Sequence, residues 1–434
     1  MEGRLLFKNC GILKNDGRAR KGLAVVVEGA CITRIAPDAE VPVLPGDWAV
    51  SCDGRTLTTG RVDCHAHLVD GLAREVDAHQ LAQAHPAGCK QRLASALTLT
   101  AQEVQALAAF SMARALRHGF TCVYEHLFAP HAVEAGLQAE AVMAEQLGLR
   151  LCASHASHAL EGAPPAKSQV RENLAFIQSR PDVGLVTGGL GFFSPALLDD
   201  TLLAEVGAES ERLRTSLHFH LAGSESDVKA AFELHGAAGL QRLASFGLLS
   251  PRSVAFGARA LDEGEWRLLR ESHTFIAWSP RDELLLPSVG TGAQVFLQGP
   301  VLRGFASGGV ASPAADGLAA LASVTALARG RRALDPDALL MELFFSGPAE
   351  LVGRTVGQPC GAVEEGMLAD LVLYDAVVPD EADAAPALLW QLFEARPAWV
   401  VVNGRVSVRE GQLLGADYLE LAREAARVLQ TRRS

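Results

Sequence analysis

Several features that mark other classes of protein are scarce or missing in this 434-residue chain. Only 6% of the residues are aromatic, and no stretch approaches the ~18 consecutive apolar residues that a membrane-spanning helix requires. The first residues lack the basic flank and the apolar core of a signal peptide. We therefore expect a cytoplasmic protein with no membrane partner.

Basic residues are fewer than acidic residues, with 39 Lys and Arg against 50 Asp and Glu. The formal net charge is −11 at pH 7, and the longest basic run, residues 329–332, is too short for the footprint of a nucleic-acid-binding protein. The 8 cysteines are scattered without a Cys-x-x-Cys pair, which indicates free thiols in a reducing compartment. The sequence thus argues against a nucleic-acid partner and against a disulfide framework.

The residues that are abundant predict an α/β fold in two parts. Hydrophobic residues make up 49% of the chain, enough for a large core. Residues 58–359 alternate short apolar runs with longer amphipathic segments, a pattern typical of a (β/α)8 TIM-type barrel. Residues 1–57 and 360–414 read as short strands. We therefore predict a small β-sandwich domain built from both termini, followed by a helix over residues 415–434.

The stretch around His65 and His67 is the first candidate for chemistry. It ends a short apolar run, and side chains at i and i+2 of an extended strand leave the same face. Both imidazoles can therefore reach one point, and imidazole is a common protein ligand for zinc. A turn or a hydrogen-bonded histidine pair explains the same spacing, so the pair alone does not establish a metal site.

Two further motifs accompany this pair: a second His-x-His, formed by His218 and His220, and the ending Gly361–Leu373. Together they make the chain similar to the amidohydrolase superfamily, in the branch of cytosine and guanine deaminases, atrazine-type chlorohydrolases and SsnA-like aminohydrolases. The resemblance covers essentially the whole chain. It implies a barrel in which the first-strand pair, a fifth-strand histidine and an eighth-strand aspartate hold one divalent metal, while nearby glutamate and histidine side chains move protons.

The sequence keeps only part of the residue set that this resemblance implies. His65, His67 and His220 match three metal ligands, so the implied cofactor is one zinc or iron ion, or none if this residual site is empty. Glycines stand where the resemblance places the proton-shuttling glutamate, the sixth-strand histidine and the eighth-strand aspartate: Gly223, Gly257 and Gly308. Because glycine has no side chain to bind a metal or carry a proton, the family's standard mechanism is not available.

Other residues are candidates to replace the missing groups. Glu125 and His126 end a predicted strand, and the carboxyl ends of strands face the active mouth of a barrel, so both are candidate catalytic residues. Arg74, His126 and His218 are candidate contacts for a substrate or ligand. His155 and His158 are assigned to surface or helix-packing roles.

Three functions are compatible with this partial site. The favoured one is a non-catalytic structural or regulatory subunit, associated with copies of itself, a paralogue or another enzyme subunit. The alternative is an atypical metal-dependent hydrolase or deaminase that acts on non-peptide C–N bonds of a small cyclic amide, amidine or aminated heterocycle through the three histidines. The third is a module that binds a small molecule at the barrel mouth without chemistry.

Overall fold

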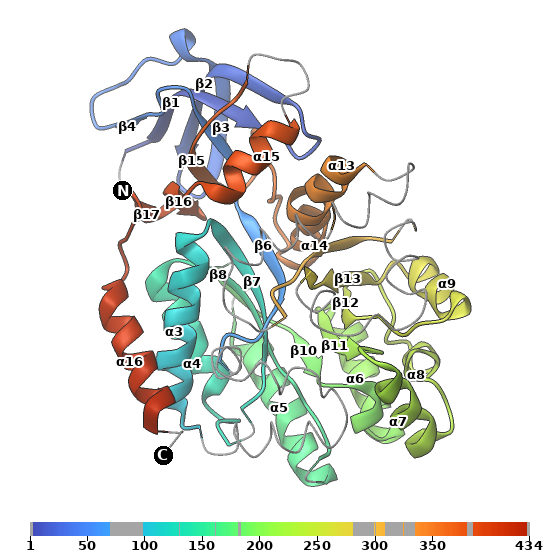
Figure 1. The fold of residues 1–434 in the computed structure, drawn as a ribbon. Helices are drawn as coiled ribbons and strands as arrows, with labels where there is room; N and C mark the ends of the chain where they lie inside the picture. Colours follow the sequence, from blue (N-terminus) through green and yellow to red (C-terminus); the bar gives the residue numbers. More distant parts are fainter. Residues whose placement is uncertain are drawn as a thin grey trace.

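The computed structural model describes residues 3–69, 99–129, 131–160, 162–180, 184–280, 299, 301–308, 324, 335–379 and 385–431. It has a β-rich part at one end of a larger α/β part (Figure 1). Arg74 lies outside the described residues, so its predicted ligand contact stays a prediction. No helix among the described residues is both long enough and apolar enough to cross a membrane.

Strands from both ends of the chain share one nine-stranded sheet in the β-rich part. Its order is β18-β17-β16-β15-β5-β1-β2-β3, with β4 beside β1, so β5 and β15 join the two halves. The predicted boundary at residue 57 falls inside β5. The strands are β1 (Leu5–Leu13), β2 (Ala19–Glu28), β3 (Cys31–Pro37), β4 (Trp48–Ser51), β5 (Arg55–Thr59), β15 (Leu371–Val377), β16 (Pro397–Val402), β17 (Arg405–Arg409) and β18 (Gln412–Leu413).

The α/β part is the predicted barrel. All its strand pairs are parallel, and β9 and β10 are two halves of one barrel strand, which leaves eight strands around the barrel. The barrel closes where the backbone N–H of Gly308 donates to the carbonyl of His65. Its strands are β6 (Arg61–Ala66), β7 (Phe120–Leu127), β8 (Arg150–His155), β9 (Val186–Gly188), β10 (Leu190–Phe192), β11 (Leu217–Leu221), β12 (Ser253–Gly257), β13 (Phe275–Trp278) and β14 (Arg303–Phe305).

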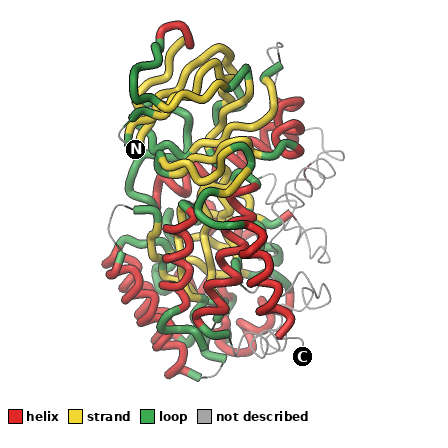
Figure 2. Tube along the Cα trace, turned by 90° about the vertical axis from the view of Figure 1, so that its left-hand side faces the viewer, coloured by secondary structure: helices red, strands yellow, loops and turns green. Residues whose placement is uncertain are grey.

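Helices form the outer layer of the barrel, as the side view shows (Figure 2). Local sequence fixes several of their ends: Thr100 and Glu103 form a capping box at the start of α3, and Gly148 ends α4 with a left-handed residue. The helices are α3 (Ala101–Arg117), α4 (Gly136–Leu147), α5 (Ala163–Ser179), α6 (Asp200–Leu213), α7 (Glu225–His235), α8 (Gly239–Ser245), α9 (Glu263–Glu271), α13 (Pro336–Met341), α14 (Gly347–Thr355), α15 (Ala385–Glu394) and α16 (Tyr418–Thr431).

A buried ion pair joins the barrel to the β-rich part. Arg150, the first residue of β8, binds both carboxylate oxygens of Asp370 at 2.8 and 3.0 Å, and both side chains are almost fully buried. The backbone N–H of Asn403 donates to the same carboxylate. Because these contacts involve the start of a barrel strand, the amino ends of the strands face the β-rich part. Their carboxyl ends lie at the opposite end of the barrel.

Candidate metal centre

Strand β6 carries a bulge around His65, and His67 follows the last residue of the strand. Between Asp63 and Ala66, β6 has one residue more than the segment of β7 with which it pairs. Such a bulge shifts the alternation of side chains and re-aims the residues that follow it. The Asp63 carboxylate anchors the bulge by accepting hydrogen bonds from the backbone N–H groups of Ser307 at 2.9 Å and His65 at 3.3 Å.

His220, near the carboxyl end of β11, completes a triangle with His65 and His67. The Nε2 atoms of His65 and His67 are 3.2 Å apart, and the Nε2 atom of His220 lies 3.0 Å from the first and 3.1 Å from the second. His65 and His67 are buried, and His220 is partly buried. The structure thus brings together the three residues that the resemblance implies as metal ligands.

Hydrogen bonding cannot satisfy all three contacts of this triangle. Each neutral imidazole nitrogen is either a donor or an acceptor, so at least one of the three pairs must join two donors or two acceptors. A shared cation removes the conflict, because all three nitrogens can present lone pairs to it. Two nitrogens bound to one zinc ion at ~2.0–2.1 Å in tetrahedral geometry are about 3.3 Å apart. The observed separations of 3.0–3.2 Å therefore fit a single metal ion.

Burial disfavours the charged form of His65 and of a neighbouring histidine, His126. It lowers the pKa of His65 well below the usual value, and the neighbouring imidazoles of His220 and His67 lower it further. Burial also lowers the pKa of His126 well below the usual value. A neutral imidazole presents a free lone pair, so protons compete little with a metal at neutral pH.

His126 on β7 is a fourth member of the cluster. One potential ligand atom from each of His65, His67, His126 and His220 lies within 4.8 Å of the others, and no carboxylate or thiolate joins them among the described residues. This residue was predicted as a catalytic or ligand-contacting group. The structure places it beside the three histidines.

Phe256 fills the side of the site where the resemblance places a sixth-strand histidine. The assignment of Gly257 to that position stays a prediction. In the structure Phe256 pairs with His220 in the β11–β12 register, and its ring stacks on His65 at 4.1 Å with an interplanar angle of 10°. A Cβ on Gly257 would instead meet the carbonyl of Leu221. The residue that faces the cluster from β12 is therefore apolar.

Gly308 and Gly223 are the glycines predicted at the positions of the metal-binding aspartate and the proton-shuttling glutamate. A Cβ on Gly308 would lie 2.9 Å from Cζ of Phe256, so the phenyl ring occupies the space that an eighth-strand side chain needs. A Cβ on Gly223 would lie 3.1 Å from Oδ2 of Asp227. Burial raises the pKa of that Asp227 carboxyl to about 7.

The remaining candidates lie around the cluster. Oε2 of Glu125 accepts a hydrogen bond from the backbone N–H of Leu68 at 2.8 Å, so this carboxylate holds the segment that follows His67. His218 lies two residues deeper on β11, where its ring stacks on Tyr124 and burial lowers its pKa to about 3. Both residues support the site from outside the four-histidine group.

Two buried histidines were missed. His155 is the last residue of β8, and His158 lies three residues further on. Both side chains are buried, so the prediction that they could lie on the surface is wrong. Burial lowers the pKa of His155 to about 3 and that of His158 to about 4. Their position just after an apolar strand is the signal that could have placed them at the carboxyl end of the barrel.

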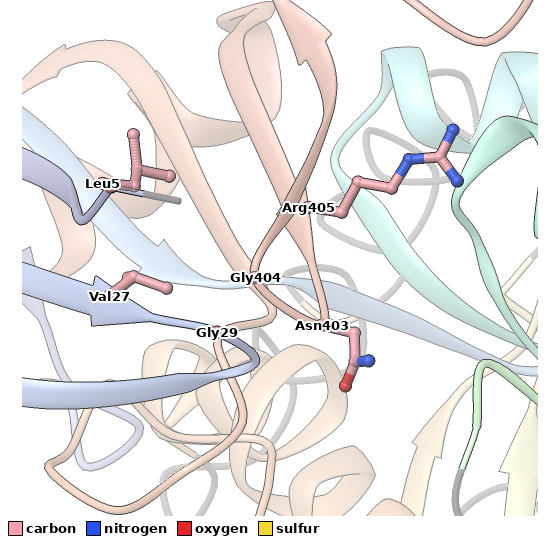
Figure 3. Close-up of a pocket in the computed structure, with 7 residues that line it drawn as sticks. Leu5, Val27, Gly29, Asn403, Gly404 and Arg405 are labelled. Carbon is pink, nitrogen blue, oxygen red and sulfur yellow. The ribbon is translucent and has the colours of Figure 1, made fainter. Parts of the chain in front are cut away.

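The β-rich part contains a hollow of about 310 Å³ whose polar lining residues make structural hydrogen bonds (Figure 3). Leu5 and Val27 line one side, and Asn403 and Arg405 extend away from them. Arg405 donates to two backbone carbonyls at the end of α4, and Asn403 accepts a hydrogen bond from Arg150. These polar groups join the two parts of the molecule, so we assign no ligand to this hollow.

A parallel barrel with histidines converging at the carboxyl ends of its strands has the architecture of a metal-dependent hydrolase. The model of the Amidohydrolase family matches residues 56–278, just over half of the chain. The chain therefore belongs to the amidohydrolase family, and the predicted membership is confirmed.

Similar proteins cover nearly the whole chain. A 5′-deoxyadenosine deaminase from Methanothermobacter thermautotrophicus is 25% identical over 425 residues, covering 94% of this chain and 95% of the relative. A 5-methylthioadenosine/S-adenosylhomocysteine deaminase from Desulforudis audaxviator is 25% identical and covers 98% of each chain.

Solved structures confirm the barrel with a small β domain. An adenosine deaminase from Xanthomonas campestris with bound zinc has a TM-score of 0.83 at 22% identity, covering 99% of this chain and 98% of that one. A zinc complex of atrazine chlorohydrolase from Arthrobacter aurescens has a TM-score of 0.80 at 19% identity, covering 98% and 100%.

Proposed function

We propose that this protein is a metal-dependent hydrolase or deaminase that acts on a C–N bond of a small cyclic amide, amidine or aminated heterocycle. The observation that carries the proposal is the triangle of Nε2 atoms from His65, His67 and His220. The relatives named as deaminases match this chain over almost its full length. Both findings favour the catalytic alternative over the non-catalytic subunit that the sequence alone favoured.

In this proposal the three imidazoles hold one zinc or iron ion through Nε2 and add no charge to it. A bound ion of this kind supplies Lewis-acid chemistry and a nucleophile from water near neutral pH. The ring of Phe256 covers one side of His65, and Phe193 lies 4.7 Å from the ring of His220. Two aromatic walls exclude water there and suit a flat heterocyclic substrate, which stacks on such rings.

Proton transfer is the step that the described residues support least. The position three residues after His220 is Gly223, and no carboxylate of the described residues belongs to the histidine cluster. A positioned acid or base contributes ~10²–10⁴-fold to a rate. We therefore expect turnover to be slower by about that factor than in a family member with the complete residue set.

Ammonia release from zinc-loaded protein tests the proposal. The substrates are 5′-deoxyadenosine, 5-methylthioadenosine and S-adenosylhomocysteine, for which the relatives are named. We expect slow release from at least one substrate, and its loss in His220→Ala and after chelation. His235→Ala, which changes a histidine on α7 outside the site, is the matched control.

Turnover that survives both chelation and His220→Ala would overturn the proposal. Stoichiometric zinc without turnover of any of these substrates would also overturn it and would return the protein to the non-catalytic interpretation.

A further inference from the structure

His126 sits over the histidine triangle at nearly equal distances from its three members. Its ring centroid lies 5.2 Å from that of His65, 5.6 Å from that of His67 and 5.3 Å from that of His220. This imidazole belongs to β7, whereas His65 lies in β6, His67 directly follows it, and His220 lies in β11. The four rings thus surround one point from three strands.

The imidazole of His126 is fully buried and has unsatisfied polar atoms. Its side chain has no solvent exposure, and neither ring nitrogen has a hydrogen-bond partner among the described residues. Buried polar groups in native proteins almost always have a partner, and a buried nitrogen without one costs free energy. A metal ion that accepts a lone pair from a ring nitrogen of His126 would give that nitrogen a partner and remove its cost.

The opposite side of the cluster is closed to a carboxylate ligand. Gly308 has a left-handed φ of 64°, and the space beside it holds the ring of Phe256, which stacks on His65. The eighth-strand position therefore cannot supply the fourth donor without moving this ring. On the β7 side, by contrast, one potential ligand atom of His126 lies within 4.8 Å of those of the other three histidines.

We propose that His126 is the fourth protein ligand of the metal held by His65, His67 and His220, and that it replaces the missing eighth-strand carboxylate. This inference rests on the proposed metal centre. Four neutral nitrogen donors favour zinc, copper, iron or nickel over magnesium or manganese, which prefer oxygen. Zinc can expand to five ligands, so four histidines leave room for a water molecule.

Zinc affinity of the chelator-stripped full-length protein tests the inference, by competition with a chromophoric chelator. Loss of a supporting residue around a metal typically weakens binding ~10–100-fold, so loss of a direct ligand in His126→Ala should weaken it by at least about 100-fold. His126→Phe keeps a ring in the same space without a nitrogen and should show the same loss if the role is ligation. His158→Ala removes an equally buried histidine outside the group and should change the affinity less than about 3-fold.

The absorption spectrum of the cobalt-substituted protein reports ligation independently of affinity. We expect the cobalt d–d bands of His126→Phe to differ from those of the wild type and those of His158→Ala to match it. Wild-type affinity and spectrum in His126→Phe, with zinc lost in His65→Ala/His67→Ala, would overturn the His126 assignment and leave the three-histidine centre intact. Zinc affinity that is unchanged in His65→Ala/His67→Ala would instead overturn the proposed metal centre itself.

Discussion

The wall that Phe256 and Gly308 form beside His65 gives a prediction whose magnitude follows from the structure. A Cβ on Gly308 would lie 2.9 Å from Cζ of Phe256 and 3.1 Å from Oγ of Ser279, on a backbone with φ of 64°. The left-handed backbone costs a residue with a Cβ about 1–2 kcal/mol. Overpacking against the phenyl ring costs about 1–3 kcal/mol more. Gly308→Ala should therefore lower the free energy of unfolding by about 2–5 kcal/mol.

A matched glycine separates the two contributions. Gly247 has a similar φ of 67° but has nothing within 4 Å of its built Cβ, so Gly247→Ala should show the backbone cost alone. Adding Phe256→Ala to Gly308→Ala removes the contact, so a double-mutant cycle should give a favourable coupling of about 1–3 kcal/mol. Urea unfolding of the variants measures these free energies. Equal costs for Gly308→Ala and Gly247→Ala, with no coupling to Phe256, would refute the argument that this ring displaces the eighth-strand ligand.

Three further predictions concern the supports of the site. Asp370→Ala should lower the free energy of unfolding by about 3–5 kcal/mol, because it leaves the guanidinium of Arg150 buried without its carboxylate; an effect below about 1 kcal/mol in urea unfolding would contradict this. Glu125→Ala removes the acceptor of the Leu68 N–H and should weaken zinc binding about 10–100-fold in the chelator competition, whereas wild-type affinity would show that Glu125 does not position the site. Burial raises the pKa of Asp227 from 3.8 to about 7, so the folded state binds a proton more tightly than the unfolded state. The contribution of this carboxyl to wild-type stability should therefore fall as the pH rises from 4 to 7, by up to about 3 kcal/mol. Asp227→Asn should lack that part of the fall, and equal pH slopes for the two proteins in urea unfolding would exclude it.

Local sequence patterns were enough to predict the barrel and three of the clustered histidines. The alternation of apolar runs with amphipathic segments is a repeating local signal, and it gave the β/α order that the structure shows. The i, i+2 spacing places His65 and His67 on one face, and the family resemblance selects His220. Each of these predictions depends on neighbours in sequence or on a motif.

The contacts that sequence analysis did not give depend on strand register and barrel closure. Whether Phe256 or Gly257 faces the cluster is set by the pairing of β12 with β11, and a shift of one residue reverses the face. His126 meets the triangle only because β7 lies beside β6 in the closed barrel. His155 looked like a surface residue because its partners come from elsewhere in the chain, such as Asn173, whose Oδ1 accepts a hydrogen bond from the His155 backbone N–H.

Metal content measured by elemental analysis tests the central claim most directly. The full-length protein should be purified without chelator beside His65→Ala/His67→Ala. The triangle of Nε2 atoms predicts about one equivalent of zinc or iron in the wild type and almost none in the double variant. Absence of metal from both proteins, or equal metal in both, would contradict the assignment of these histidines as a metal centre.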